Sequence, residues 1–492
     1  MNRDASPGSA GGADDHAHSK ADRFNASNSL TIRLKLCDKP GTLGVVTTLI
    51  GHKGVDIGAI DIVGHEADGT VRDFTLNVVT PEAGLELVEA LRGVPGVEVV
   101  NFSDQTFRAH LGGKIEIVGK TSIKDRDDLS RIYTPGVARV CKAIAADPNK
   151  VHSLTMKGNT IAIVSDGSRV LALGNIGPYG ALPVMEGKAL LFKRFGNVNA
   201  VPIVLGTQDP EQIIAAVKAI APTFGGINLE DIASPGCWEI ERRLKEELDI
   251  PIFHDDQHGT AVVVLAATIN AAKVVKKQLR HLRIVVSGVG AAGMACCRLL
   301  MAAGVKNIVG FNINGPIYRG RTDLNSEEQW LAANSNPKNF KGSMRDALKG
   351  ADMFLGLSAA GVIQGKDLTV MRRDPIVFAL ANPVPEVTPE AAAAHGARII
   401  ATGGSEYANQ INNSLAFPGI FKGVLQCRAR FITDEMKMEA ARALAGVVPK
   451  TMLSDEYIIP GMFNEKAHEA VTQAVIRVAH ATGQARRPLR TR

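Results

Sequence analysis

The sequence predicts an α/β protein of more than one domain, and three observations carry this prediction. The chain has 492 residues, of which 45% are hydrophobic and 22% charged, as in folded enzymes rather than disordered or fibrous chains. Residues 29–107 combine strands of alternating polarity with two helical segments. From about residue 115 onward, short apolar strands alternate with helices, which is typical of parallel sheets.

Charge and hydrophobic patterning exclude several classes of function. The net charge is +6, four arginines lie in the last ten residues, and only 5% of the residues are aromatic. The rest of the chain is therefore close to neutral, and we expect no nucleic-acid partner. No apolar run approaches the roughly 18 residues that cross a bilayer, and the N-terminus has no apolar signal core. We therefore expect a cytoplasmic protein without a membrane partner.

The N-terminal segment predicts a tail followed by a small domain. Residues 1–28 contain almost no large apolar side chains and are expected to form a disordered tail. Residues 29–107 predict a βαββαβ order, which is typical of the ferredoxin-like arrangement. The predicted elements are a strand at 29–36, a helix at 43–53, strands at 55–63 and 71–79, a helix at 81–92 and a strand at 97–102.

The first turn of this small domain carries a resemblance. Residues 38–43 read DKPGTL, and with this turn the domain at 29–107 resembles an ACT domain, a regulatory module that often binds amino acids between paired copies. The resemblance implies an amino-acid effector. The alternative is a dimerisation domain that binds no ligand.

A glycine-rich turn predicts a dinucleotide site. Residues 288–293 read GVGAAG between a strand at 284–287 and a helix at 294–303. In this setting a GxGxxG turn lets the backbone approach a pyrophosphate at the helix N-terminus, as in Rossmann domains. The alternative is a tight strand-to-helix turn without a ligand. The predicted coenzyme contacts are Gly288, Gly290, Ala291, Ala292 and Gly293.

The second strand of this motif leaves the coenzyme open. An Asp or Glu about 20 residues after the turn usually binds the ribose 2'-hydroxyl of NAD. Asn312 stands at that place, so no carboxylate there repels the 2'-phosphate of NADP. Arg319 and Arg321 are close enough in sequence to bind such a phosphate. Both NAD and NADP therefore remain open.

Two acidic pairs follow neighbouring strands. Glu230 and Asp231 follow the strand at 226–229, and Asp255 and Asp256 follow the strand at 250–253. Consecutive parallel strands place their carboxyl ends side by side, so four carboxylates are expected to crowd one crevice. Crowded carboxylates disfavour one another unless a cation binds, and oxygen ligands suit Mg²⁺ or Mn²⁺. The alternative is N-capping of the following helices.

Lys188 is a candidate general base. It falls at helical spacing with Met185 and Phe192, which places it on the apolar face of a helix that begins near residue 181. A desolvated lysine loses proton affinity and can accept a proton near neutral pH. The alternative is a lysine that extends its ammonium group to water.

Tyr133 is a candidate acid. It precedes Thr134 and Pro135, which predict the N-cap and the first residue of a helix that reaches about residue 146. This position would direct its hydroxyl into the crevice. The alternative is a packing role.

Six motifs in order make the chain from about residue 115 resemble the malic enzymes, in the short bacterial form with an added ACT domain. The motifs are 132–138 (IYTPGVA), 174–178 (GNIGP), 229–231 (LED), 254–260 (HDDQHGT), 381–383 (ANP) and 412–413 (NN). The resemblance implies a catalytic domain at 115–280, a Rossmann domain at 281–482, a basic tail at 483–492 and a homodimer or homotetramer. It implies oxidative decarboxylation of L-malate to pyruvate and CO₂ with reduction of NAD or NADP.

The resemblance also implies roles for individual residues. Lys188 would accept the proton of the malate hydroxyl, Tyr133 would protonate the enol of pyruvate, and Asp255 would tune Lys188. The remaining roles are Glu230, Asp231 and Asp256 as ligands of Mg²⁺ or Mn²⁺; Arg169, Asn382, Asn412 and Asn413 at the substrate; and Asn312 and Asn382 at the coenzyme. Ile411 departs from the pattern, because a glycine often stands there, and it could alter the fit of the substrate.

Three alternatives to this function remain. A malolactic-type activity or an oxaloacetate-decarboxylating activity would keep the site without net reduction of coenzyme. A non-catalytic assembly that senses amino acids through the ACT domain would need no active site.

Overall fold

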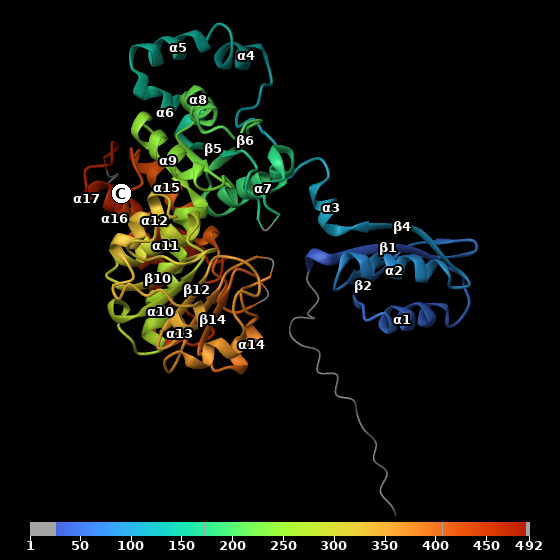
Figure 1. The fold of residues 1–492 in the computed structure, drawn as a ribbon. Coiled ribbons are helices and arrows are strands. Elements are labelled where there is room, and N and C mark those ends of the chain that lie inside the picture. The colour runs from blue at the N-terminus through green and yellow to red at the C-terminus, as the bar shows by residue number, and fades with distance from the viewer. Residues whose placement is uncertain (1–25, 172, 383, 406, 489–492) are drawn as a thin grey trace, which may run out of the picture. The chain divides into compact units, whose positions relative to one another are not determined.

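The structure is a computed structural model that describes residues 26–171, 173–382, 384–405 and 407–488 (Figure 1). It contains two compact units, Met1–Gly112 and Gly113–Arg492, called unit 1 and unit 2 below. Most of the predicted disordered tail lies outside the described residues, and Ala26–Asn28 form a short 3-10 helix. Within the described part of the chain, no helix is both long and apolar enough to span a membrane.

Unit 1 has the predicted βαββαβ order. Its elements are β1 (Ser29–Leu36), α1 (Thr42–His52), β2 (Asp56–Glu66), β3 (Gly69–Asn77), α2 (Pro81–Arg92) and β4 (Val97–Asp104), followed by α3 (Gln105–His110). The sheet is antiparallel with the order β2-β3-β1-β4. Alternate residues of β1 such as Ile32 and Leu34 pack with Phe74 of β3 and with Val46 and Leu87 of the two helices. The alternation seen in the sequence therefore places both helices on one face.

Unit 2 begins with short helices and a parallel sheet. The helices are α4 (Arg126–Ile132), α5 (Val137–Ala146) and α6 (Val151–Leu154). The sheet has the order β6-β5-β7-β8, from β5 (Thr160–Ser165), β6 (Asn199–Val204), β7 (Gly226–Leu229) and β8 (Ile252–His254). Its helices are α7 (Gly177–Leu191), α8 (Pro210–Ile220), α9 (Gly236–Glu247) and α10 (Asp255–Val274).

The predicted start of one helix is wrong. Tyr133 caps the C-terminus of α4, and α5 begins at Val137 with Gly136 as its N-cap. The peptide bond between Thr134 and Pro135 is cis. The N–H of Val137 donates to Tyr133 O, so residues 133–136 form a turn between two helices instead of the first turn of one.

A second sheet follows in unit 2, with the order β11-β10-β9-β12-β13-β14, parallel except for β11. Its strands are β9 (Arg283–Ser287), β10 (Asn307–Asn312), β11 (Gly315–Pro316), β12 (Met353–Gly356), β13 (Ile376–Ala379) and β14 (Ile399–Thr402). Its helices are α11 (Ala291–Ala302), α12 (Ser326–Asn334), α13 (Met344–Leu348) and α14 (Pro389–Ala394). The chain order reverses between β9 and β12, as in doubly wound sheets that bind dinucleotides.

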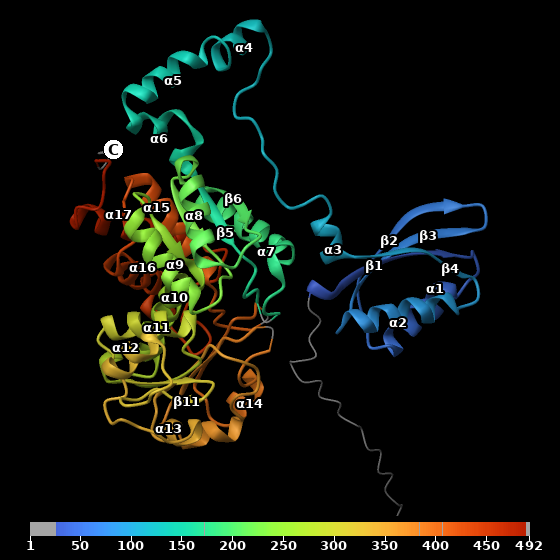
Figure 2. The same cartoon turned by 45° about the horizontal axis from the view of Figure 1, so that its top comes forward.

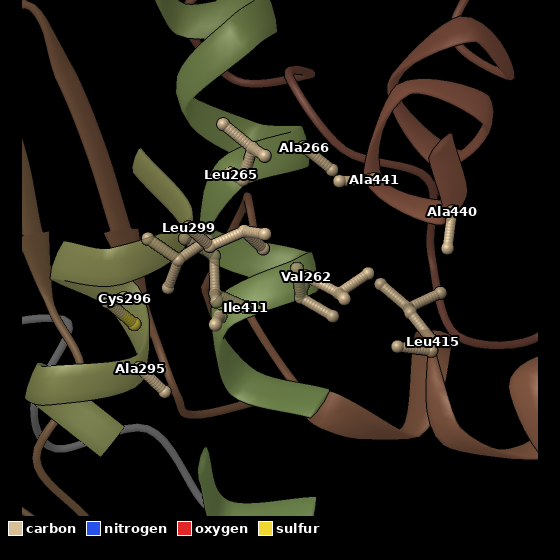
Figure 3. Packing of buried hydrophobic residues seen from close by; sticks show 14 of the residues in the cluster. Val262, Leu265, Ala266, Ala295, Cys296, Leu299, Ile411, Leu415, Ala440 and Ala441 are labelled. Atoms are coloured by element: carbon tan, nitrogen blue, oxygen red, sulfur yellow. The ribbon is translucent and has the colours of Figure 1, made fainter. Parts of the chain in front are cut away.

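One hydrophobic core joins the two sheets of unit 2. The last helices are α15 (Phe417–Cys427), α16 (Asp434–Gly446) and α17 (Glu465–Ala481); α15 and α16 each pack on α17, and α16 also packs on α10. Figure 3 shows Val262 and Leu265 of α10 between Leu299 of α11 and Ala441 of α16. Ile411 lies in the same core and is only 6% exposed. Its side chain is therefore a packing group of this core.

The C-terminal basic segment is partly bound to the body of unit 2. Arg486 forms an ion pair with Asp249, and Arg430 pairs with the same carboxylate. The backbone N–H groups of Arg486 and Arg487 donate to Cys427 O. Residues 489–492 of the predicted tail lie outside the described residues.

Candidate active site

The two acidic pairs meet at the carboxyl edge of the first sheet. Strands β7 and β8 are parallel neighbours, and Leu229 lies opposite His254. The residues that follow each strand therefore leave the sheet at the same place. Ligand oxygens of Glu230, Asp231 and Asp256 lie within 4.8 Å of one another, so the structure brings together the three predicted metal ligands.

Lys188 lies between the two pairs. Its Nζ donates to Glu230 Oε1 and to Asp255 Oδ2, both at 2.5 Å, and lies 4.6 Å from the centroid of the Phe417 ring. The side chain is 8% exposed. Helix α7 buries Met185 and Lys188 on the same face, as helical spacing predicts. The charge of Lys188 is tolerated there because its ammonium group contacts carboxylates at the sheet edge instead of water.

Burial and crowding raise the pKa of three carboxyl groups in this cluster, Glu230, Asp231 and Asp255. Burial, opposed by Lys188, raises the pKa of Glu230 and of Asp255 above their usual values. Burial and the neighbouring Asp256 raise the pKa of Asp231 to about 8. Burial alone would lower the pKa of Lys188, but Asp255, Glu230 and Asp256 outweigh it and raise the pKa, so the amine keeps its proton here.

The cluster has the donors that a divalent cation needs. Asp231 Oδ2 and Asp255 Oδ1 are buried and have no hydrogen-bond partner among the described residues. Asp231 has a φ of 53°, a left-handed conformation that is unusual for a non-glycine residue and is frequent at functional sites. Buried carboxylate oxygens without donors, in a cluster whose acid pKa values are raised by crowding, fit a hard cation such as Mg²⁺ or Mn²⁺.

A buried network that the sequence did not predict supports the second acidic pair. Glu241 of α9 accepts hydrogen bonds from the N–H of His254 at 3.2 Å and from His258 Nε2 at 2.8 Å. Burial lowers the pKa of His258 to about 4, so its ring is neutral near pH 7 and its Nδ1 accepts from Lys437 Nζ. Glu241 lies in a charged helical stretch whose other acids face solvent, so no local pattern distinguishes it. His258 lies in the first turns of α10, and the metal-ligand triad contains no histidine.

The predicted substrate residues differ in their placement. Arg169 is exposed, and its backbone N–H donates to Asp231 O at 3.0 Å, which places it beside the acidic cluster. Asn412 uses its side-chain oxygen to accept from the N–H of Ser414 and cap a short helix. A Cβ built on Gly259 would lie 3.2 Å from Asn413 Cβ and 1.8 Å from Asp255 Oδ1, so Asn413 lies next to the cluster. The geometry therefore favours Asn413 over Asn412 as the free amide.

The glycine-rich turn has the backbone that a dinucleotide site needs. Gly288 has a φ of 87°, and a Cβ there would lie 2.4 Å from Leu357 O. A Cβ on Gly293 would lie 1.9 Å from Gly288 O. Gly290 is the N-cap of α11, and a Cβ on Gly290 would have only one neighbouring atom within 4 Å among the described residues, Ser234 Oγ at 3.9 Å. Ser234 is three residues after Asp231, so its position beside Gly290 shows that the coenzyme turn faces the acidic edge. Ala291 and Ala292 are the first two residues of α11.

The end of β10 is a closed polar network. Arg321 donates from Nε and Nη2 to Asp323 at 2.7 and 2.8 Å, from Nη2 to Asn312 Oδ1 at 2.9 Å, and from Nη1 to Gly315 O and Pro316 O. These five bonds use all five N–H groups of a guanidinium. Arg321 therefore has no donor left for a phosphate, contrary to the sequence-based expectation, while Arg319 is exposed.

A buried carboxylate lies behind Asn312. Asn312 Nδ2 donates to Glu328 Oε1 at 2.8 Å, and the backbone of Asn325 donates to the other Glu328 oxygen. The hydrogen bonds of Arg321 lower the pKa of Asp323 to about 2, so this carboxylate is ionised at neutral pH. Glu328 and Asp323 thus flank the position where a ribose-binding acid was expected.

The two remaining predicted residues lie in exposed segments. Asn382 is exposed and lies against Gly403, where a Cβ would approach Asn382 Nδ2 to 2.4 Å. Tyr133 is 66% exposed. Figures 1 and 2 both show its helices, α4 and α5, standing apart from strands β5 and β6 and from helix α7, which carries Lys188, and neither helix buries a side chain. The structure therefore does not bring Tyr133 to the acidic cluster of its own chain.

Comparison with known proteins gives one consistent result. Residues 112–245 match the malic enzyme N-terminal domain, and residues 257–482 match the malic enzyme NAD binding domain. The chain is 54% identical over 462 residues to the NAD-dependent malic enzyme of Geobacillus stearothermophilus, covering 94% of this chain and 96% of that relative. It is 49% identical to the bifunctional malic/malolactic enzyme of Bacillus subtilis, covering 76% of this chain and 92% of the relative.

A solved structure agrees with the fold. The crystal structure of the malic enzyme from Pyrococcus horikoshii matches with a TM-score of 0.74 and 51% identity, covering 77% of this chain and 89% of that one. Both matched domains, the relatives and the solved structure lead to the same conclusion. The chain belongs to the malic enzyme family, whose members are NAD(P)-dependent enzymes that oxidise and decarboxylate malate.

Proposed function

We propose that this chain is a divalent-metal-dependent malic enzyme that converts L-malate to pyruvate and CO₂ and prefers NAD as its coenzyme. One observation carries the proposal: Lys188 lies 2.5 Å from both Glu230 and Asp255 at an edge that faces the glycine-rich turn. A base, a set of metal ligands and a coenzyme turn thus share one crevice.

Glu230, Asp231 and Asp256 would hold Mg²⁺ or Mn²⁺. Such an ion supplies Lewis-acid stabilisation of the negative charge that develops on the substrate oxygen. Asp255 is not part of the triad and holds Lys188 in place through its Oδ2. A cation beside Glu230 and Asp256 also offsets the negative charge that raises the pKa of Lys188.

Lys188 would accept the proton of the malate 2-hydroxyl as the hydride leaves the same carbon, after its ammonium group has released its own proton to solvent, a loss that the bound cation favours by offsetting the surrounding negative charge. Its ammonium group is held by two carboxylates and packs on Phe417, so its position is defined before substrate binds. Arg169, beside Asp231, would pair with a substrate carboxylate. Asn413 would donate to the substrate, and Asn382 to the substrate or the coenzyme.

Tyr133 would act in the site of a second copy of the chain. Helices α4 and α5 leave Leu129, Ile132 and Tyr133 exposed and bury no side chain, which is expected of a segment that packs on a partner. A homodimer would let this segment deliver the acid that the single chain lacks. Mixing Tyr133→Phe with Lys188→Ala tests this, since mixed dimers should recover activity that neither variant has, whereas an acid in the same chain predicts no recovery.

The closed network at the end of β10 supports NAD over NADP. A 2'-phosphate there would meet the ionised Asp323, while Arg321 has no free N–H group. The name of the Geobacillus stearothermophilus relative, NAD-dependent malic enzyme, agrees with this choice.

Unit 1 would regulate the enzyme through an amino acid. Its βαββαβ order and its DKPGTL turn support an ACT domain, and the alignment with the Geobacillus stearothermophilus relative is too long to lie in unit 2 alone. Calorimetry of the full chain with each amino acid tests this. Binding that also changes turnover supports regulation, and no binding by any amino acid favours a dimerisation role.

The test of the reaction is malate-dependent reduction of NAD and NADP in parallel, with Mn²⁺ or EDTA, while pyruvate is quantified. We expect NADH and pyruvate in equal amounts, less NADPH, and no product with EDTA. The Bacillus subtilis relative is named as bifunctional, which makes a malolactic activity the second candidate. Lactate formed without net NADH would indicate that activity, and no turnover under any condition would contradict both.

A further inference from the structure

Glu386 is a buried carboxylate that the proposed chemistry does not use. It is fully buried in the loop after β13. Its Oε1 accepts from the N–H of Ser358 at 2.7 Å and from Ser358 Oγ at 3.3 Å, and its Oε2 accepts from the N–H of Ala381 at 3.1 Å. Among the described residues it forms no ion pair. A buried charge that only neutral donors stabilise is costly, so its retention needs an explanation.

The donors of Glu386 belong to two loops at the carboxyl edge of the second sheet. Ser358 follows β12, and its Oγ lies 2.8 Å from Ser287 Oγ at the end of β9. The preceding Leu357 packs its carbonyl oxygen against Gly288 of the coenzyme turn. Ala381 follows β13 and directly precedes Asn382. Glu386 therefore links the coenzyme turn to the loop that carries Asn382.

The sheet order identifies which half of the coenzyme this carboxylate faces. The ribose-binding position lies at the end of β10, on one side of β9, and β12 and β13 lie on the other side. The nicotinamide half of a dinucleotide bound across this reversal lies over the ends of β12 and β13. A Cβ on Gly356, the last residue of β12, would lie 2.4 Å from Glu386 Cδ, so the backbone leaves room for the carboxylate there.

We propose that Glu386 is a positioning residue for the nicotinamide half of the coenzyme, and that its buried charge favours the oxidised, cationic ring over the reduced, neutral one. The inference rests on the coenzyme binding of the proposed function. Its two carboxylate oxygens hold the N–H groups of Ser358 and Ala381, and with them both loops. Its charge is poorly screened because it is buried and forms no ion pair within the described part of the chain.

The test compares two substitutions by equilibrium binding of NAD⁺ and of NADH to the full chain without malate. Glu386→Gln removes the charge and one acceptor, and we expect affinity for NAD⁺ to fall at least about fivefold more than affinity for NADH. Glu386→Asp keeps the charge and lengthens the hydrogen bonds. This substitution should lower the affinities for NAD⁺ and for NADH by similar factors, so that the ratio of the two affinities stays unchanged.

Two further measurements separate positioning from loss of the fold. Hydrogen exchange by mass spectrometry should show faster exchange in residues 353–361 and 376–382 of Glu386→Gln, with circular dichroism as in the unsubstituted chain. Glu390→Gln is the matched control, because both Glu390 carboxylate oxygens are buried without a hydrogen-bond partner among the described residues.

Unchanged NAD⁺ affinity in Glu386→Gln, or an equal loss for NAD⁺ and NADH, would overturn the proposal. If Glu386→Gln does not fold, Glu386→Asp decides the proposal. A changed ratio of NAD⁺ affinity to NADH affinity in Glu386→Asp would contradict it. Failure of the unsubstituted chain to bind either coenzyme would contradict the proposed function instead, so the two failures are distinguishable.

Discussion

The acidic edge of the first sheet and the end of β10 in the second sheet are both polar and charged, but they differ in whether their hydrogen-bond donors and acceptors have partners. At the acidic edge, four carboxylates face one lysine, and buried oxygens of Asp231 and Asp255 have no partner among the described residues. At the end of β10, all five N–H groups of Arg321 are used, and both oxygens of Glu328 accept hydrogen bonds.

The difference teaches how a polar cluster indicates its role. An unsatisfied buried acceptor costs free energy until a ligand or ion satisfies it, which supports the proposed metal site at the acidic edge. A saturated network gains nothing from a new ligand and disfavours one of like charge, which supports the proposed preference for NAD over NADP at the end of β10. Charge alone would have given both regions the same interpretation.

The largest expected effect removes the buried lysine of the acidic edge. Lys188→Ala should lower kcat by about 10² to 10⁴, with coenzyme binding retained, because the proposed base is lost. Lys193→Ala, at an exposed lysine just after α7, is the matched control. Steady-state kinetics and NADH binding provide the readouts, and near-normal turnover in Lys188→Ala would remove this residue from the role of base.

A second substitution tests whether the carboxylate oxygens of the acidic edge bind a cation. Mn²⁺ should raise the Tm of the unsubstituted chain, and Asp256→Asn should weaken the Mn²⁺ affinity derived from that shift at least about tenfold. Glu239→Gln, at an exposed carboxylate on α9, should leave the shift intact. An equal Mn²⁺ shift in Asp256→Asn and the unsubstituted chain would mean that the triad is not the metal site.

A third substitution opens the saturated network. Asp323→Ala frees two N–H groups of Arg321 and removes an ionised carboxylate, so the ratio of kcat/KM for NADP to that for NAD should rise about tenfold. Glu439→Ala removes an exposed carboxylate on α16 and serves as the control. If NADP remains as poor a substrate in Asp323→Ala, saturation of Arg321 does not explain the coenzyme preference.

The smallest effect is expected where charges are exposed. Arg486 pairs with Asp249, but the two side chains are 37% and 67% exposed, so water competes with the pair. Arg486→Ala should lower the free energy of unfolding by about 1 kcal/mol or less, measured by denaturant unfolding. A loss well above that value would show that an exposed pair here behaves like the buried cluster, which would weaken the comparison.

Patterns within a few residues predicted much of the fold. The alternation in β1 and the helical pattern at 81–92, which is α2 in the structure, are local signals, and unit 1 has the predicted order. The start of α5 is the counterexample. Pro135 resembled a first helical residue, but the bonds of residues 133–136 form a turn between two helices.

The candidate site divides in the same way. The sequence by itself determined the acidic pairs after β7 and β8, the lysine on the apolar face of α7 and the glycine-rich turn, because residue type and spacing suffice for these. Only the tertiary structure decided that Arg321 is saturated, that Glu241 and Glu386 are buried supports, and that Tyr133 does not reach the cluster in its own chain. The physical reason is distance along the chain: Lys188 meets Asp255 across 67 positions, and hydrogen-bond satisfaction depends on such partners.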